Sequence, residues 1–141
     1  MSKSPEQKYD DARENFAKLI KRWMTINKWS HPAMTKLSKQ CLDDTAWFHS
    51  SQISVLRNGK VKNVGPKVFI ALERLNYRIY RYVVNKELIP GTDSSNNYRN
   101  AHAVTVNGQP PSLGSWMELF CGDQDIESVQ FLSSTSALED N

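Results

Sequence analysis

The sequence predicts a mainly α-helical protein, in which five short helices form a bundle and a small irregular, acidic extension follows at the C-terminus. Apolar side chains recur every three to four residues through much of positions 9–88, as in helices with one buried face. Capping residues, prolines and an Asn-Gly pair divide this pattern into short segments. At 141 residues, the chain has the length of one compact domain.

The first two helices are expected before position 42. Apolar residues from Tyr9 to Trp23 follow the helical step, and lysines and arginines occupy the opposite side. This first helix is expected to end near Asn27. Ser30 followed by Pro32 is typical of a new helix start, because a serine hydroxyl caps free N–H groups and proline fits the first turn. The second helix is therefore expected over residues 32–40.

A third, shorter helix is expected to begin at Ser50 or Ser51 as its cap. Ile53 and Leu56 are three residues apart and point inward in this interpretation. The pair Asn58-Gly59 then ends the helix, since both residue types tolerate the left-handed conformation found after helix ends.

The fourth and fifth helices are expected over residues 66–75 and 77–88. Pro66 suits a first helical position, where a missing N–H costs nothing. Each segment carries an apolar stripe, and Pro90-Gly91 ends the second one.

Less regular structure is expected after Pro90. The sequence predicts a polar loop over 92–100 and then a short strand over 101–106 before an Asn107-Gly108 turn. A helix is expected over 116–121, with Ser115 and Glu118 as a capping pair and Gly122 at its end. Residues 133–141 are expected to form a flexible tail. A helix this short is unstable alone, so its large aromatics Trp116 and Phe120 must pack on the rest of the chain or on a second subunit.

Charge is unevenly distributed along the chain. Residues 1–90 hold seventeen of the eighteen lysines and arginines and eight acids, a balance of +9, whereas residues 91–141 hold one arginine and seven acids, a balance of −6. A basic segment of this kind suggests a polyanionic partner, and a solvated basic face without a partner is the alternative.

Residues 49–62, HSSQISVLRNGKVK, resemble the recognition helix of helix-turn-helix proteins of the Cro and phage-repressor type, also called XRE-like or lambda-repressor-like. In that family the helix opens with small polar residues, has two apolar core residues three apart, and closes on a glycine followed by basic residues. Ile53, Leu56, Asn58, Gly59 and Lys60 match this pattern. The resemblance extends over about residues 16–76, and it implies a lambda-repressor-like bundle that binds DNA.

One departure from the family lies between the second and third helices. Leu37 and Ile53 are sixteen positions apart, which is several residues more than is usual there. The enlarged turn contains two acids and two large aromatic residues, and we expect the aromatic side chains to pack into the core. These residues are Asp43, Asp44, Trp47 and Phe48.

The resemblance also implies which side chains meet DNA, because a helix fits the major groove and its polar residues reach base edges. It places Ser50, Ser51, Gln52 and Val55 at base-facing positions, beside Ser54 and Asn58, and it places Arg57, Lys60 and Lys62 near phosphates. Ser30 and His31 begin the second helix, whose N–H groups are candidates for a phosphate oxygen. For the serines and His31, simple capping is the alternative.

No motif of an enzyme, a metal site or a cofactor site is recognised in the sequence. Cys41 and Cys121 are too few for a disulfide framework and are expected to be buried free thiols. The chain has no apolar run long enough for a membrane span, and its N-terminus is polar, so we expect a cytoplasmic protein. We expect it to be a nucleoid-associated protein of bacterial or phage origin.

The sequence therefore suggests four regions: residues 1–15 extend the first helix, 16–90 form a helix-turn-helix DNA-binding domain, 91–132 form an acidic segment suited to homodimer contact, and 133–141 form the tail. The expected function is sequence-specific binding of double-stranded DNA by a transcriptional regulator of repressor type. The alternative is an interaction adaptor on the same scaffold that does not read bases.

Overall fold

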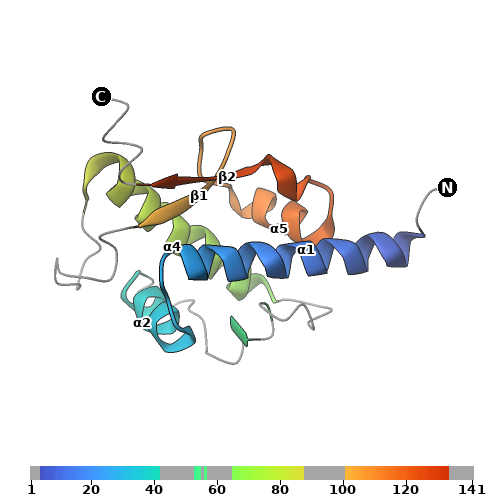
Figure 1. Cartoon of the computed structure of the whole chain (residues 1–141), viewed down its shortest axis with the longest axis horizontal. Helices are drawn as coiled ribbons and strands as arrows, with labels where there is room; N and C mark the ends of the chain where they lie inside the picture. The colour runs from blue at the N-terminus through green and yellow to red at the C-terminus, as the bar shows by residue number, and fades with distance from the viewer. Residues whose placement is uncertain (1–3, 42–52, 55, 57–64, 88–100, 134–141) are drawn as a thin grey trace.

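The computed structural model describes residues 4–41, 53–54, 56, 65–87 and 101–133 (Figure 1). Within them the elements follow in the order α1 (Pro5–Ile26), α2 (His31–Cys41), α4 (Pro66–Asn85), β1 (His102–Val106), α5 (Leu113–Cys121), the 3-10 helix η1 (Ile126–Ser128) and β2 (Val129–Ser133). Ile53, Ser54 and Leu56 are also helical. Figure 1 shows α1 as the long central helix, with α5 and the sheet on one side and α2 on the other.

The prediction of a five-helix bundle is wrong, since the described residues form four helices and a two-stranded antiparallel sheet. The helices expected over 66–75 and 77–88 are one helix, α4. Asn76 does not interrupt it, because its side chain is buried and hydrogen-bonded to a strand. The C-terminal extension is not irregular either, because residues 101–133 form both strands and α5.

α1 begins at Pro5, within residues 1–15, which the sequence predicts as an extension of the first helix. The Ser4 hydroxyl caps it by accepting the N–H of Gln7 at 3.2 Å, and Pro5 occupies the first turn. The buried face consists of apolar side chains at helical spacing, namely Ala12, Phe16, Ala17, Leu19, Ile20, Trp23 and Met24. Most charged side chains of the helix therefore lie toward solvent.

A tight turn joins α1 to α2, and it confirms the predicted end of the first helix. The N–H of Lys28 donates to the Thr25 carbonyl at 3.1 Å, and the N–H of Trp29 donates to the Met24 carbonyl at 2.9 Å. This pair of bonds is a Schellman motif, with Lys28 in the left-handed conformation at φ 59°. The Ser30 hydroxyl then caps α2, as predicted.

β1 confirms the strand expected over 101–106, and β2 was not expected. The two strands pair antiparallel, with Ala103 opposite Leu132 and Thr105 opposite Gln130. After β1 the chain reverses at Asn107 and Gly108, whose φ angles of 55° and 80° are those of the predicted Asn-Gly turn.

The edge of β1 that faces away from β2 is closed by two asparagine side chains. Asn76 on α4 donates to the Val104 carbonyl at 2.8 Å and accepts the Val104 N–H at 2.7 Å. Asn27 at the end of α1 accepts the His102 N–H at 2.8 Å and donates to the His102 carbonyl at 3.1 Å. Each carboxamide thus replaces the peptide group of a neighbouring strand, which ties the sheet to both helices.

α5 packs on its own chain, through α1 and α4. Trp116 is fully buried, and Phe120 meets Phe16 and Phe69 with ring centroids 5.4 and 5.5 Å apart. The helix begins three residues earlier than predicted, because Ser112 rather than Ser115 is its cap.

Gly122 ends α5 in the left-handed conformation, as the sequence predicts, at φ 86°. A Cβ at this position would lie 3.0 Å from the Ala12 Cβ, so the glycine also lets the end of α5 approach α1 closely.

Candidate nucleic-acid interface

The most basic part of the described surface lies on the second half of α1, the turn after it, and α2. Between Asn15 and Leu42 the sequence contains six lysines and arginines and no acid. All six of these residues are exposed, and together we call them the cationic surface: Lys18, Lys21, Arg22, Lys28, Lys36 and Lys39.

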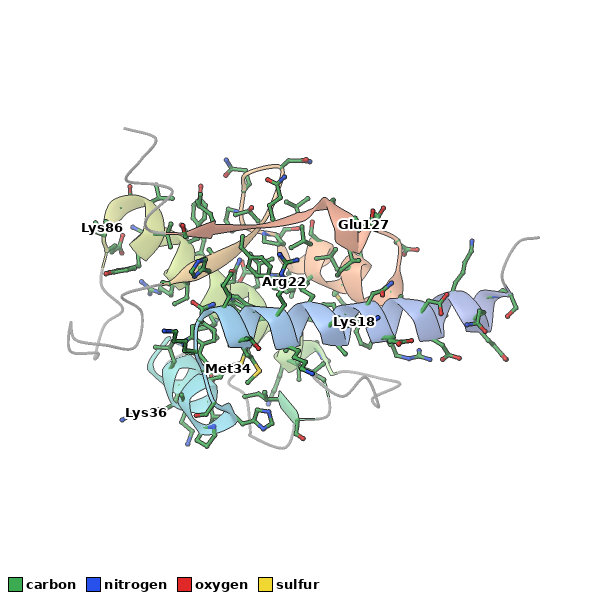
Figure 2. The ribbon with its side chains drawn as sticks, viewed as in Figure 1. Lys18, Arg22, Met34, Lys36, Lys86 and Glu127 are labelled. Carbon is green, nitrogen blue, oxygen red and sulfur yellow. The ribbon has the colours of Figure 1, made fainter. Side chains whose placement is uncertain are left out.

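The folded structure holds these cations in place through the elements that carry them. Lys18, Lys21 and Arg22 lie on α1 opposite its buried face. Lys28 is fixed in the Schellman turn, where the neighbouring Asn27 side chain is bonded to β1. Figure 2 shows Lys36 pointing outward from α2, on the other side of α1 from Arg22. The cationic surface therefore includes side chains on both sides of α1.

Few acids neutralise this surface. Lys18 lies 3.9 Å from Glu14 in an exposed ion pair, which contributes little in water. The guanidinium carbon of Arg22 lies 5.1 Å from the centroid of the Phe131 ring. For Lys21, Lys28 and Lys36, the described part of the chain provides no ion pair. These three charges are thus available for an external anion.

The cations of α4 are different, because a single acid neutralises two of them. Arg81 forms a salt bridge with Glu87, and Arg78 lies 3.9 Å from the same carboxylate. All three side chains are about one-third exposed. The end of α4 therefore contributes less free positive charge than the cationic surface.

Two hollows lie along α1, one beside its N-terminal half and one beside its second half. The larger has a volume of about 610 Å³ and lies between α1 and residues 119–126, with Asp11, Asp123 and Asp125 in its lining. The smaller, of about 350 Å³, lies between α1 and residues 126–131. The acids of the larger hollow make this end of α1 a poor surface for a polyanion.

Ser30 and His31 lie at the start of α2, as predicted, but little of that helix end is free to bind a phosphate. The Ser30 hydroxyl accepts the N–H of Ala33 at 3.2 Å. Pro32 has no N–H, and the N–H of Met34 is donated to the Ser30 carbonyl at 3.0 Å. The capping interpretation of Ser30 is therefore confirmed.

Three residues of the predicted recognition helix are described. Ile53 and Leu56 are buried, with 0% and 4% exposure, as the sequence predicts for its two core positions, and Ser54 is half-buried. The other predicted DNA-binding residues lie outside the described residues: Ser50, Ser51, Gln52, Val55, Arg57, Asn58, Lys60 and Lys62. So do Asp43, Asp44, Trp47 and Phe48 of the enlarged turn and the tail beyond Ser133.

None of the six cations of this surface is among the residues that the resemblance assigns to DNA. In the sequence, the signal for these cations is the absence of acids between Asn15 and Leu42. The resemblance to the recognition helix does not place these cations in contact with DNA.

The described residues also bear on metal sites, membrane-spanning helices and free cysteines. They contain no group of three or more His, Cys, Asp or Glu side chains that could hold a metal ion. None of their helices is long and apolar enough to cross a membrane. Cys121 is a free, half-buried thiol, and the side chain of Cys41 is outside the described part.

Comparison with known proteins identifies one family, described as a domain of unknown function (DUF8644), which matches residues 6–122. The chain belongs to this family. The part shared with DUF8644 includes the whole cationic surface, β1 and α5, and it ends before η1 and β2. No curated protein and no solved structure matches the chain.

Proposed function

We propose that this DUF8644 protein binds double-stranded DNA in a sequence-specific manner and acts as a transcriptional regulator of repressor type. The observation that supports this most is the cationic surface, with six exposed cations on α1, the turn and α2. Neutralising phosphates is the main source of affinity for DNA, and lysines on fixed helices supply that charge. A cytoplasmic, nucleoid-associated location follows from this proposal.

Base reading is assigned to the helix that contains Ile53 and Leu56. Their burial supports an amphipathic helix at this point of the chain, as the resemblance to the recognition helix requires. The base contacts assigned to Gln52 and Val55, and the phosphate contacts assigned to Arg57, Lys60 and Lys62, remain predictions from the sequence.

The test is a titration of labelled duplex DNA followed by fluorescence anisotropy at several salt concentrations. Lys21→Ala, Lys28→Ala and Lys36→Ala should each weaken binding to every duplex and lower the slope of log affinity against log salt by about 0.9 for each lost phosphate contact. Lys8→Ala is the matched control, because Lys8 is also exposed on α1 but lies in its acidic half. A salt-independent affinity, or an equal effect of Lys8→Ala, would contradict the proposal.

Specificity needs a separate measurement on a selected binding site. Gln52→Ala should lower affinity for the best site by about 1–3 kcal/mol and change non-specific binding little, because an amide can pair with one adenine edge. An equal loss on all duplexes would assign Gln52 to the DNA backbone or to folding.

The larger hollow favours the second candidate function, that of an interaction adaptor. Its acidic lining and its apolar side chains, such as Tyr9 and Ile126, suit a basic peptide with an apolar residue. The two functions are distinguished by the same titration, since an adaptor would show no salt-dependent binding to any duplex.

A further inference from the structure

The smaller hollow has an apolar wall built by three elements. Its apolar lining consists of Leu19 of α1, Ile126 of η1, and Val129 and Phe131 of β2. Leu19 is buried and the other three side chains are half-buried, so part of their apolar surface still faces the hollow. A volume of about 350 Å³ lies within the range of sites that bind small molecules, roughly 300–1,000 Å³. The hollow is therefore large enough for a small ligand with an apolar body.

Positive charge lines the same hollow. Lys18 and Arg22 belong to its lining, and both are exposed. They lie four residues apart on α1, so their side chains share one face of the helix. Figure 2 shows the Arg22 side chain on the side of α1 that faces the sheet. One ligand can therefore contact the apolar wall and both cations.

Neither cation is strongly neutralised within the described residues. Lys18 has the exposed pair with Glu14 at 3.9 Å, and no ion pair of Arg22 occurs among them. The Arg22 guanidinium carbon instead lies 5.1 Å from the centroid of the Phe131 ring, a contact that leaves the N–H donors of a guanidinium to other partners. Phe131 thus holds a cation next to the apolar wall, where a carboxylate of the ligand would meet it.

The lining also limits the charge that a ligand can carry. Glu127 is the one acid among the described lining residues, it is exposed, and no described cation forms an ion pair with it. Lys18 and Arg22 against Glu127 leave a balance of two minus one, or +1. A monocarboxylate matches this balance, whereas phosphate or a dicarboxylate brings a second negative charge near Glu127.

We propose that the smaller hollow binds a short fatty acid, and that this ligand weakens DNA binding by occupying Lys18 and Arg22. The carboxylate pairs with the two cations, and the alkyl chain lies against Leu19, Val129 and Phe131. The ligand site follows from the hollow alone. Its effect on DNA rests on the proposed function, because Lys18 and Arg22 belong to the cationic surface. Two ligands that need the same cations each lower the affinity of the other.

An NMR titration of the full, isotope-labelled chain with sodium octanoate tests the site without DNA. We expect saturable shifts of the Val129 and Phe131 amides, with a dissociation constant of about 10 mM or lower. Hexanoate should bind more weakly by about 4-fold for each methylene that it lacks, and acetate should give no saturable shift. Absence of saturation, or shifts that gather at Asp123 in the larger hollow, would overturn the proposal.

Charge variants test the assigned contacts. Lys18→Gln and Arg22→Gln should each raise the dissociation constant of octanoate about 2- to 5-fold, the range for exposed ion pairs, and Glu127→Gln should lower it. Lys21→Gln is the matched control, because Lys21 is also an exposed cation of α1 but does not line the hollow. Circular dichroism establishes that each variant is folded. An effect of Lys21→Gln equal to that of Arg22→Gln would contradict the site, since octanoate would then bind the charged surface in general.

The effect on DNA is measured by duplex titration in octanoate and in acetate at equal concentration, so that the ionic strength is the same. Octanoate should weaken binding and lower the salt slope by about 0.9 for each cation that it occupies, and the double variant Lys18→Gln, Arg22→Gln should not respond. Octanoate that binds in the NMR titration and leaves duplex affinity unchanged would refute the effect on DNA. A chain that binds no duplex contradicts the proposed function instead, while the NMR titration still decides the ligand site.

Discussion

The two edges of the small sheet differ in the groups that bind their outward backbone atoms. Asparagine side chains from α1 and α4 occupy the outward backbone groups of His102 and Val104 on β1, so no further strand can add there. On the outer edge of β2, by contrast, the Val129 N–H donates to the Ile126 carbonyl of η1, a bond within the backbone of the same segment. The comparison shows that helices can complete the edge of a sheet through two carboxamides.

The closed edge depends most on Asn76, and its loss should have the largest effect. Asn76→Ala removes both bonds to Val104, which is fully buried, so the N–H and carbonyl of Val104 lose their partners where water cannot replace them. Each such group costs about 1–3 kcal/mol, so we expect a loss of about 2–5 kcal/mol in the free energy of unfolding by urea. Asn15→Ala, on the exposed side of α1, should change it by less than about 0.5 kcal/mol.

Asn76→Asp sharpens this test through pH. A carboxylate accepts the Val104 N–H but repels the Val104 carbonyl, and burial without a counter-charge raises the pKa of the introduced carboxyl above its value of about 3.9 in the unfolded chain. The protonated acid can donate and accept like asparagine. Relative to wild type, the variant should therefore be most stable below about pH 4 and lose stability as pH rises through the folded-state pKa. A difference from wild type that does not vary with pH would contradict this.

Asn27 holds the same edge in a more exposed setting. Its partner His102 is half-buried, and the His102 carbonyl also accepts the Trp23 indole N–H at 2.8 Å. Asn27→Ala should therefore cost less than Asn76→Ala, about 1–2 kcal/mol. Amide hydrogen exchange should accelerate at His102 and stay slow at Val104. Equal acceleration at both amides would mean that the edge opens as one unit.

The contrast also shows what the sequence could predict. Local signals identified the turn at Asn107-Gly108, the helix stop at Gly122 and the cap at Ser30, because each depends on residues within one turn. The division into helices over 66–75 and 77–88 was wrong, because Asn76 between them is a buried helical residue whose hydrogen-bond partner, Val104, is 28 residues away in sequence. β2 was missed because five residues have little strand signal apart from their pairing with β1.

The candidate site also has features that the sequence predicts and features that only the structure shows. The abundance of lysine between Asn15 and Leu42 is visible in the sequence, but that all six cations are exposed requires the helix packing. Of the residues assigned to DNA from the resemblance, only Ser30, His31 and Ser54 lie in the described part of the chain. The inward positions Ile53 and Leu56 were predicted correctly from their spacing.

Two buried tryptophans offer a smaller test of how α1 and α5 support the closed edge. Trp23 and Trp116 are both fully buried and in contact, but Trp23 donates its indole N–H to His102, whereas the Trp116 indole N–H has no hydrogen-bond partner among the described residues. Phenylalanine removes similar volume at each site. Trp116→Phe should therefore be less destabilising than Trp23→Phe by about 1 kcal/mol in urea unfolding. The reverse order would mean that the indole bond to β1 contributes little.

The smallest expected effect concerns the turn that places Asn27 against β1. Lys28 follows it at φ 59°, a conformation in which a side chain is strained and which glycine usually occupies in a Schellman motif. Lys28→Gly relieves this strain but gives the unfolded chain more freedom, so the net expectation is a stabilisation of about 0.5–1 kcal/mol. The same change removes one charge of the cationic surface, so stability and DNA affinity should move in opposite directions. Lys28→Ala separates the two effects, because it removes the charge and keeps the strain, and it should therefore lower DNA affinity as much as Lys28→Gly without raising the urea midpoint.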